Sequence, residues 1–196
     1  VDYPFLFSGT ITYIKKIIEN NKYGKVVDIE SFREQAPVRN DSNVIWDLGI
    51  HDISILAYLL KNKPIKIRTI KKKNLRNNIC DTAYINLKYS NGINVVIKNS
   101  WISPTKIRVI KIKFDKAILH CDENESLYKI KIYKKRTKNN WKNYKLEIPS
   151  IDLEEPLLKM TKYIYEAIKH RNNYLFKNNF NLKITSLLEK INKSNA

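Results

Sequence analysis

The chain has 196 residues, of which 43% are hydrophobic and 29% are charged. This balance supports a buried core and excludes a wholly disordered chain, and no apolar run reaches the roughly 18 residues of a membrane-spanning helix. The net charge of +18 would ordinarily favour nucleic acid as a partner, but only seven of the 37 basic residues are arginine, the residue best suited to phosphate and base contacts. An A/T-rich genome accounts for the lysine, asparagine and isoleucine excess together, so we do not expect nucleic acid as a partner. We do not expect a membrane as a partner either, because the chain has no long apolar run.

Hydrophobic periodicity predicts a fold that begins with helices and continues as a sheet. In chain order, the expected elements are a helix over 10–22, a strand over 26–32, an irregular segment over 33–45, a helix over 46–60, strands over 65–71, 81–89, 93–102, 107–114, 118–121, 127–133 and 141–148, and helices over 154–170 and 180–192. Ser8 or Thr10 is the expected first N-cap, and residues 90–92 are an expected hairpin turn. The lysine-rich segment 134–140 is expected to be a solvated hairpin loop, with an anion-binding surface as the alternative. The sequence therefore predicts an α+β fold: a largely antiparallel open sheet of about six to eight strands with helices on one face.

The few cysteines and histidines do not indicate a metal site. Cys80 and Cys121 are too few for a disulfide framework, so we interpret them as reduced core thiols of a cytoplasmic protein. His120 precedes Cys121 in a predicted strand, where consecutive side chains point to opposite faces. No metal ligand set is expected.

Ionisable residues concentrate in the otherwise apolar helix over 46–60. Asp47, His51 and Asp52 lie in its first two turns, and burying such groups is costly unless they are paired or used. Asp47 and His51 are four residues apart, which places them on one face of a regular helix. A histidine held by a carboxylate is suited to general acid/base catalysis. The alternative is an acid that favours the helix N-terminus next to a satisfied core histidine.

Several segments resemble the C-terminal domain of the Gfo/Idh/MocA family of oxidoreductases, including its nucleotide-sugar branch. The segment Trp46-Asp47-Leu48-Gly49-Ile50-His51-Asp52 is similar to the family's conserved helix in that domain. The other similar segments, in order, are residues 1–7, 24–26 with 31–33, 91–92 with 100–108, 154–157, 182–184 and 188–189. The resemblance thus spans nearly the whole chain.

The resemblance implies that residues 1–196 form the substrate-binding and oligomerisation domain of an NAD(P)-dependent dehydrogenase acting on a sugar or nucleotide sugar. His51 would be the catalytic acid/base, with Asp47 as its orienting or substrate-binding partner. Arg33, Asp52, Lys106 and Arg108 are the residues expected to bind substrate. NAD or NADP would be bound mainly by an N-terminal Rossmann domain that is absent here, since the chain has no GxGxxG.

Two further expectations follow from the resemblance. Family members associate through their open sheets, which predicts a homodimer or homotetramer. The segment Glu34–Pro37 departs from the family pattern, which has a glycine after the arginine, so the backbone near the ligand should differ. The alternative function is a stand-alone or vestigial sugar- or partner-binding module without redox activity.

Overall fold

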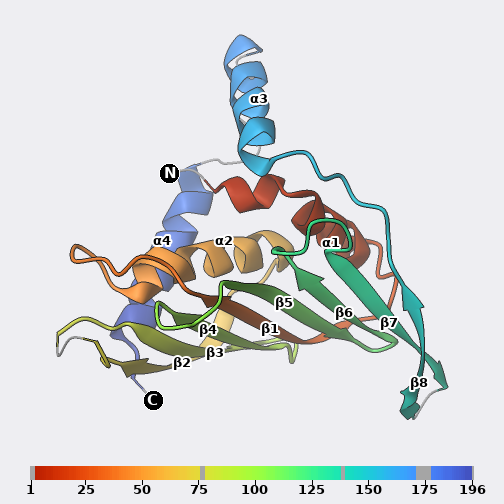
Figure 1. The fold of residues 1–196 in the computed structure, drawn as a ribbon, viewed down its shortest axis with the longest axis horizontal. Coiled ribbons are helices and arrows are strands. Elements are labelled where there is room, and N and C mark those ends of the chain that lie inside the picture. Colours follow the sequence, from red (N-terminus) through yellow and green to blue (C-terminus); the bar gives the residue numbers. More distant parts are fainter. Residues whose placement is uncertain (1–2, 76–77, 138–139, 171–177, 196) are drawn as a thin grey trace.

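Eight strands form one open sheet in the order β2-β3-β4-β1-β5-β6-β7-β8 (Figure 1). The structure, a computed structural model, describes residues 3–75, 78–137, 140–170 and 178–195. The strands are β1 (Val26–Glu34), β2 (Pro64–Lys72), β3 (Thr82–Tyr89), β4 (Asn94–Ser100), β5 (Ile107–Phe114), β6 (Ala117–Asp122), β7 (Ile130–Thr137) and β8 (Asn140–Glu147). The helices are α1 (Gly9–Glu19), α2 (Ile50–Leu59), α3 (Pro156–Lys169) and α4 (Asn178–Lys193), together with a 3₁₀ helix (Pro4–Phe7) and a π-helical turn (Ile45–Gly49).

Strand β1 lies in the middle of the sheet, between β4 and β5. It runs parallel to β4, whereas every other neighbouring pair of strands is antiparallel. Because side chains alternate along a strand, Ile29, Ser31 and Arg33 all face the buried side of β1. The parallel register places Arg33 opposite Asn99 of β4. The first strand therefore delivers polar groups to the centre of the buried face.

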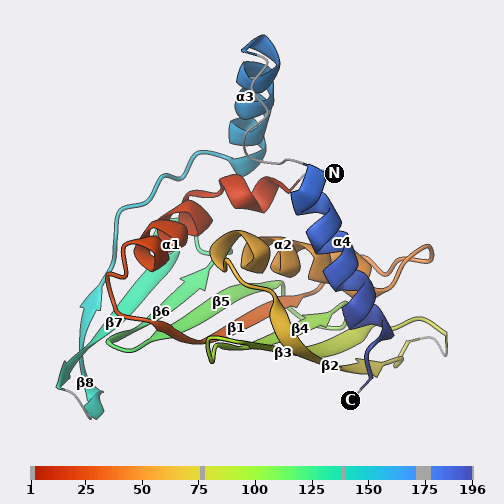
Figure 2. The same cartoon turned by 180° about the vertical axis from the view of Figure 1, so that it is seen from behind.

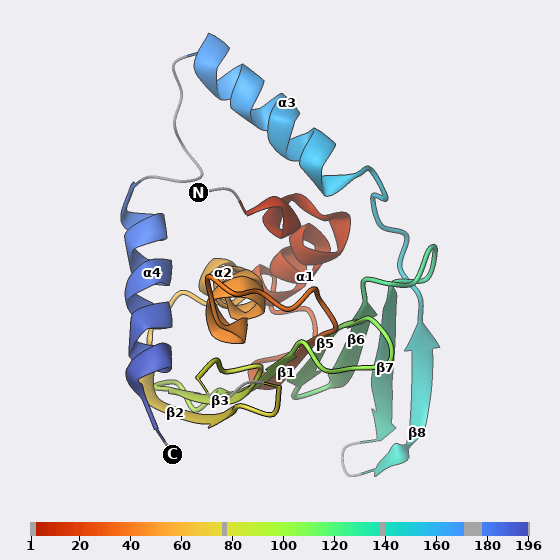
Figure 3. The same ribbon diagram turned by 60° about the vertical axis from the view of Figure 1, so that its left-hand side comes forward.

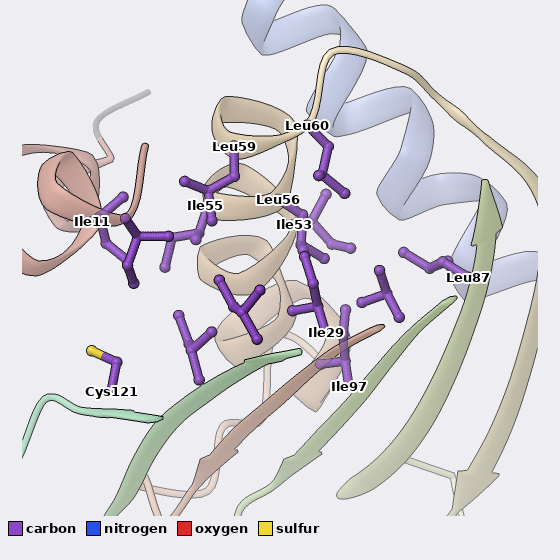
Figure 4. Packing of buried hydrophobic residues seen from close by; sticks show 14 of the residues in the cluster. Ile11, Ile29, Ile53, Ile55, Leu56, Leu59, Leu60, Leu87, Ile97 and Cys121 are labelled. Carbon is purple, nitrogen blue, oxygen red and sulfur yellow. The ribbon is translucent and has the colours of Figure 1, made fainter. Parts of the chain in front are cut away.

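Helices α1, α2 and α4 cover one face of the sheet, as Figures 1 and 2 show from opposite sides. Helix α2 lies at the centre of the core, where Ile53 and Leu56 are at most 2% exposed and pack above Ile29 and Ile97 (Figure 4). Helix α3 projects away from the sheet (Figure 3) and carries exposed apolar side chains, including Tyr165 and Ile168. No described helix is both long enough and apolar enough to cross a membrane.

The predicted fold class is confirmed, and so are several local details of the prediction. Ser8 is the N-cap of α1, since its Oγ accepts a hydrogen bond from Ile11 N at 3.3 Å. Gly92 has φ +87° in the predicted hairpin turn. Cys80 and Cys121 are buried free thiols, as expected.

Two sequence predictions of local structure had the wrong extent. The hairpin predicted over residues 134–140 is present, but its loop is shorter than expected, because β7 continues to Thr137 and the antiparallel β8 begins at Asn140. Its residues 138–139 lie outside the described part of the chain. The helix expected over 46–60 is not uniform either, because residues 45–49 form the π-helical turn and α2 begins only at Ile50.

Candidate functional site

The candidate site lies where the π-helical turn joins α2. Asn43 caps this segment, because its side-chain oxygen accepts hydrogen bonds from Ile45 N at 3.0 Å and Trp46 N at 3.3 Å. A π-helical turn contains more residues per turn than an α-helix, so a spacing of four no longer stacks two side chains there. This local geometry separates the contacts of Asp47 from those of His51.

Asp47 is held by groups from two loops rather than by His51. The indole N–H of Trp101 donates a hydrogen bond to Asp47 Oδ2 at 2.8 Å. The Arg39 guanidinium lies 3.7 Å from Asp47 Oδ1. The carboxylate is thus fixed at the N-terminal end of the α2 segment, and it makes no hydrogen bond to the imidazole.

The His51 ring is packed but has no hydrogen-bond partner. Its Nδ1 is buried without a partner among the described residues. The Phe5 ring, from the 3₁₀ helix, contacts it edge to face at a centroid distance of 4.9 Å. Burial, followed by the nearby positive charge of Arg33, lowers the His51 pKa from 6.5 to about 4, against the opposing charges of Asp52 and Asp47. The ring is therefore neutral near pH 7, and Nε2, which is not among its fully buried atoms, is the nitrogen that a substrate could reach.

Asp52 lies at the centre of a buried polar network beneath the site. Its Oδ1 accepts hydrogen bonds from Ser31 Oγ at 2.8 Å and Arg33 Nε at 3.2 Å, and its Oδ2 accepts one from Asn99 Nδ2 at 2.6 Å. Asp52 is 1% exposed and Arg33 is 3% exposed. We refer to Ser31, Arg33, Asp52 and Asn99 as the Asp52 network. Burial makes this pairing obligatory, since either charge alone would be strongly destabilising.

Phe5 links the Asp52 network to the histidine. The guanidinium carbon of Arg33 lies 4.6 Å from the centre of the Phe5 ring, within the range of a cation–π contact. Because the same ring meets His51, one aromatic side chain fixes both groups. The imidazole thus lies above a rigid support built from β1, β4 and α2.

Arg108 lies at the edge of the site and braces the backbone after β1. Its Nη1 donates to the carbonyls of Glu34 and Ile107, and its Nη2 donates to the Gln35 carbonyl at 2.9 Å. Burial and the charge of Arg33 lower the Arg108 pKa from its ordinary value. Gln35 itself has φ +64°, a left-handed conformation that glycine adopts without strain. Gln35 thus has a glycine-like backbone, and the departure of Glu34–Pro37 from the family's backbone stays a prediction.

The remaining predicted residue, Lys106, is exposed, and its side chain makes no contact with the Asp52 network. Four contributing residues were missed as site residues: Ser31, Asn99, Trp101 and Phe5. Ser31 was detectable, because it lies two positions before Arg33 on the same face of a strand. Asn99 and Trp101 reach the site through sheet pairing and a loop, and Phe5 reaches it through a 3₁₀ helix, none of which has a sequence signal of its own.

None of the four glycines forms a cradle for a dinucleotide. A Cβ atom at Gly9 would collide with the Asp152 carbonyl oxygen, and one at Gly49 would meet Asn99 Oδ1 at 3.0 Å. Gly24 and Gly92 serve turns with positive φ. Over the described ranges, no group of three His, Cys, Asp or Glu residues is arranged to hold a metal ion. The groups that the structure brings together here are the side chains of Asp47, His51 and the Asp52 network.

Solved structures similar to this one include several oxidoreductases. UDP-N-acetylglucosamine 3-dehydrogenase from Acidithiobacillus ferrooxidans matches with a TM-score of 0.79 at 16% identity, over 96% of this chain and 58% of that one. An aldose-aldose oxidoreductase from Caulobacter crescentus, complexed with glycerol, matches with a TM-score of 0.80 at 12% identity, over 98% of this chain and 60% of that one. A 3-ketoreductase from Actinomadura kijaniata in complex with TDP-benzene and NADP matches with a TM-score of 0.80 at 9% identity, over 98% of this chain and 60% of that one.

These likenesses establish the fold, and the chain spans about three fifths of the length of these proteins. No curated protein sequence shows significant similarity to the chain. The family model of the GFO/IDH/MocA C-terminal domain matches residues 11–120, which include β1, the π-helical turn, α2 and the whole Asp52 network. The chain therefore belongs to the GFO/IDH/MocA C-terminal domain family.

Proposed function

We propose that this chain is the substrate-binding half of an NAD(P)-dependent oxidoreductase acting on a sugar or nucleotide sugar, and that His51 exchanges the proton of the reacting hydroxyl. One observation carries the proposal: a histidine that is neutral near pH 7, with no hydrogen-bond partner among the described residues, is packed above a buried ion pair. Such a ring can accept a proton without first breaking a bond within the protein. Family membership supports the class of reaction.

Each neighbouring residue has a role that follows from its exposure. Asp47 is partly exposed and held by Trp101 and Arg39, which suits it to accept a hydrogen bond from a second substrate hydroxyl. Arg33 and Asp52 are too deeply buried to lie against a substrate, so we assign them the support of His51. Arg108 keeps the wall of the site in place, and exposed Lys106 is free to meet an anionic part of the substrate.

We infer that the nicotinamide dinucleotide binds mainly outside this chain, because the sequence has no GxGxxG loop and the Asp152 carbonyl fills the space beside Gly9 at the start of α1. We propose that a Rossmann domain, of the kind that would make up the remaining two fifths of the similar structures, binds it. The exposed apolar face of α3, with Leu157, Ile164 and Ile168, suits burial against such a domain. No chemical step through the dinucleotide is assigned to residues of this chain.

The test is a turnover assay on the intact gene product. Reduction of NAD⁺ or NADP⁺ would be followed by absorbance, with UDP-N-acetylglucosamine and with free aldoses as substrates. The variant His51→Asn should lower kcat by about 10²- to 10⁴-fold, as expected for loss of a general base. His120→Asn is the matched control, because His120 lies on β6 away from the Asp52 network. Since His120 is opposite Lys111 on the uncovered sheet face, sedimentation velocity should first show that this variant keeps the wild-type assembly. Full turnover by His51→Asn would refute the role of His51, and sugar binding without any nicotinamide dependence would indicate a stand-alone binding module.

We also propose that copies of the protein associate through the sheet face that no helix covers. On this face Val96 of β4 is 38% exposed and lies among charged residues such as Glu30 and Lys111. A homodimer or homotetramer would bury it. Sedimentation velocity should show the Val96→Asp variant as a smaller species than the wild type, and a monomeric wild type would refute the association.

A further inference from the structure

A pocket lies at the opposite end of α2 from His51. It has a volume of about 170 Å³ and is enclosed by the end of α2, the start of β2 and helix α4, which runs beside α2 (Figure 3). Its apolar lining includes Leu60, Ile67, Phe180 and Leu187. Because a comparable apolar cavity in another protein holds a benzene molecule, this one has room for a single ring.

Tyr89, at the end of β3, also lines this pocket and has an unpartnered hydroxyl group. The residue is 2% exposed, and its hydroxyl makes no hydrogen bond within the described part of the chain. The hydroxyl is not one of the fully buried unpartnered atoms, so it is open to the pocket. Burial alone raises the pKa of Tyr89 to about 12, so the hydroxyl remains a hydrogen-bond donor at neutral pH. A ligand in the pocket can therefore accept a hydrogen bond from Tyr89.

Positive charge collects around the same pocket. Lys61, Lys63, Lys183 and Lys190 all line it, and no aspartate or glutamate does. None of the four forms an ion pair with a described carboxylate, whereas lysines elsewhere, such as Lys98 and Lys134, do. The C-terminal end of α2 favours two of these charges, Lys61 and Lys63. Lys183 and Lys190, on α4, are seven residues apart and so share one helix face.

We propose that this pocket binds a small organic anion with an apolar body. Its ring would occupy the space between Leu60, Ile67 and Leu187, its inner oxygen would accept a hydrogen bond from Tyr89, and its carboxylate would lie among the lysines. This combination selects against plain inorganic anions, which leave the apolar lining empty, and against neutral ligands, which leave the lysines unpaired. The site is independent of the proposed sugar chemistry, because none of its residues belongs to the Asp52 network.

The experiment is calorimetric titration of the 196-residue chain with 4-hydroxybenzoate as the probe. For ten heavy atoms in a preformed pocket we expect a dissociation constant on the order of 1 mM. Tyr89→Phe removes one hydrogen bond with little change of volume and should weaken binding about fivefold. The double variant Lys183→Gln/Lys190→Gln should weaken it by a similar factor and reduce its dependence on salt. Lys193→Gln, on the same helix but outside the pocket, is the matched control and should leave binding unchanged.

Two further ligands complete the test. The neutral analogue 4-hydroxybenzyl alcohol should bind at least about fivefold more weakly than the acid, and inorganic phosphate at the same concentration should not displace the probe. Absence of saturable binding, equal binding by Tyr89→Phe, equal binding of the alcohol, or displacement by phosphate would each overturn the proposal. The readout is binding alone, so failure of the proposed dehydrogenase activity leaves this result unaffected.

Discussion

Replacing Asp52 by alanine should be among the most damaging single changes in the chain. The substitution removes a carboxylate that is 1% exposed and leaves Arg33, Ser31 and Asn99 without their common acceptor. The charged donor accounts for roughly 1.5–3 kcal/mol and each neutral donor for about 1 kcal/mol, so we expect a loss of about 3–5 kcal/mol in the free energy of unfolding. Urea denaturation followed by circular dichroism measures this directly.

A control and a double variant make the prediction specific to burial. Glu30→Ala, also on β1, removes an exposed carboxylate that lies 4.0 Å from Lys111 and should cost less than about 0.5 kcal/mol. The pair Arg33→Met/Asp52→Leu replaces both charges by apolar side chains and should be more stable than Asp52→Ala alone, because no uncompensated charge remains. A loss below about 1 kcal/mol for Asp52→Ala would refute the account of the Asp52 network.

Two further predictions concern the same region. The His51 pKa is lowered from 6.5 to about 4 in the folded protein, so between these pH values the unfolded chain binds a proton that the folded chain does not. The free energy of unfolding should therefore decrease by up to about 3 kcal/mol as the pH falls from 6.5 towards 4. Urea titrations at several pH values would show a smaller pH dependence for His51→Gln, and an NMR titration placing the His51 pKa near 6.5 would contradict the burial argument. Gln35, at φ +64°, should tolerate Gly but lose about 1–2 kcal/mol as Val, because a β-branched side chain is strained in that conformation. Thermal melts that rank Val above Gly would show that the strain is absent.

Much of the fold was predictable, because it depends on periodicity. Strands such as β5 and β6 alternate buried and exposed residues so regularly that their existence follows from the sequence. The extension of β7 to Thr137 was not predictable in this way, since its lysine-rich end has no apolar alternation and is stabilised by pairing with β8. The π-helical turn at Ile45–Gly49 was also missed, because its residues have ordinary helical spacing.

The structure places several of the predicted site residues near one another, but their contacts differ from those expected from the sequence. Asp47, His51 and Asp52 were identified as chemically unusual because they interrupt an apolar helix. The expected pairing of Asp47 with His51 assumed a regular helix, whereas the structure gives Asp47 to Trp101 and Arg39. The true partners of Asp52 come from β1 and β4, whose parallel pairing is a long-range property that local spacing does not encode.

That parallel pairing has a consequence for how the chain folds. Arg33 and Asn99 meet only when β1 pairs with β4, and the strands β2 and β3 lie between these two in the sequence. Closing so long a loop is slow, and folding rates fall as contacts become more distant in sequence. The support of His51 should therefore be completed late, on a timescale of milliseconds to seconds. During synthesis β1 has neither of its neighbours until β4 and β5 emerge, and this is the interval when misfolding and chaperone capture are most favoured.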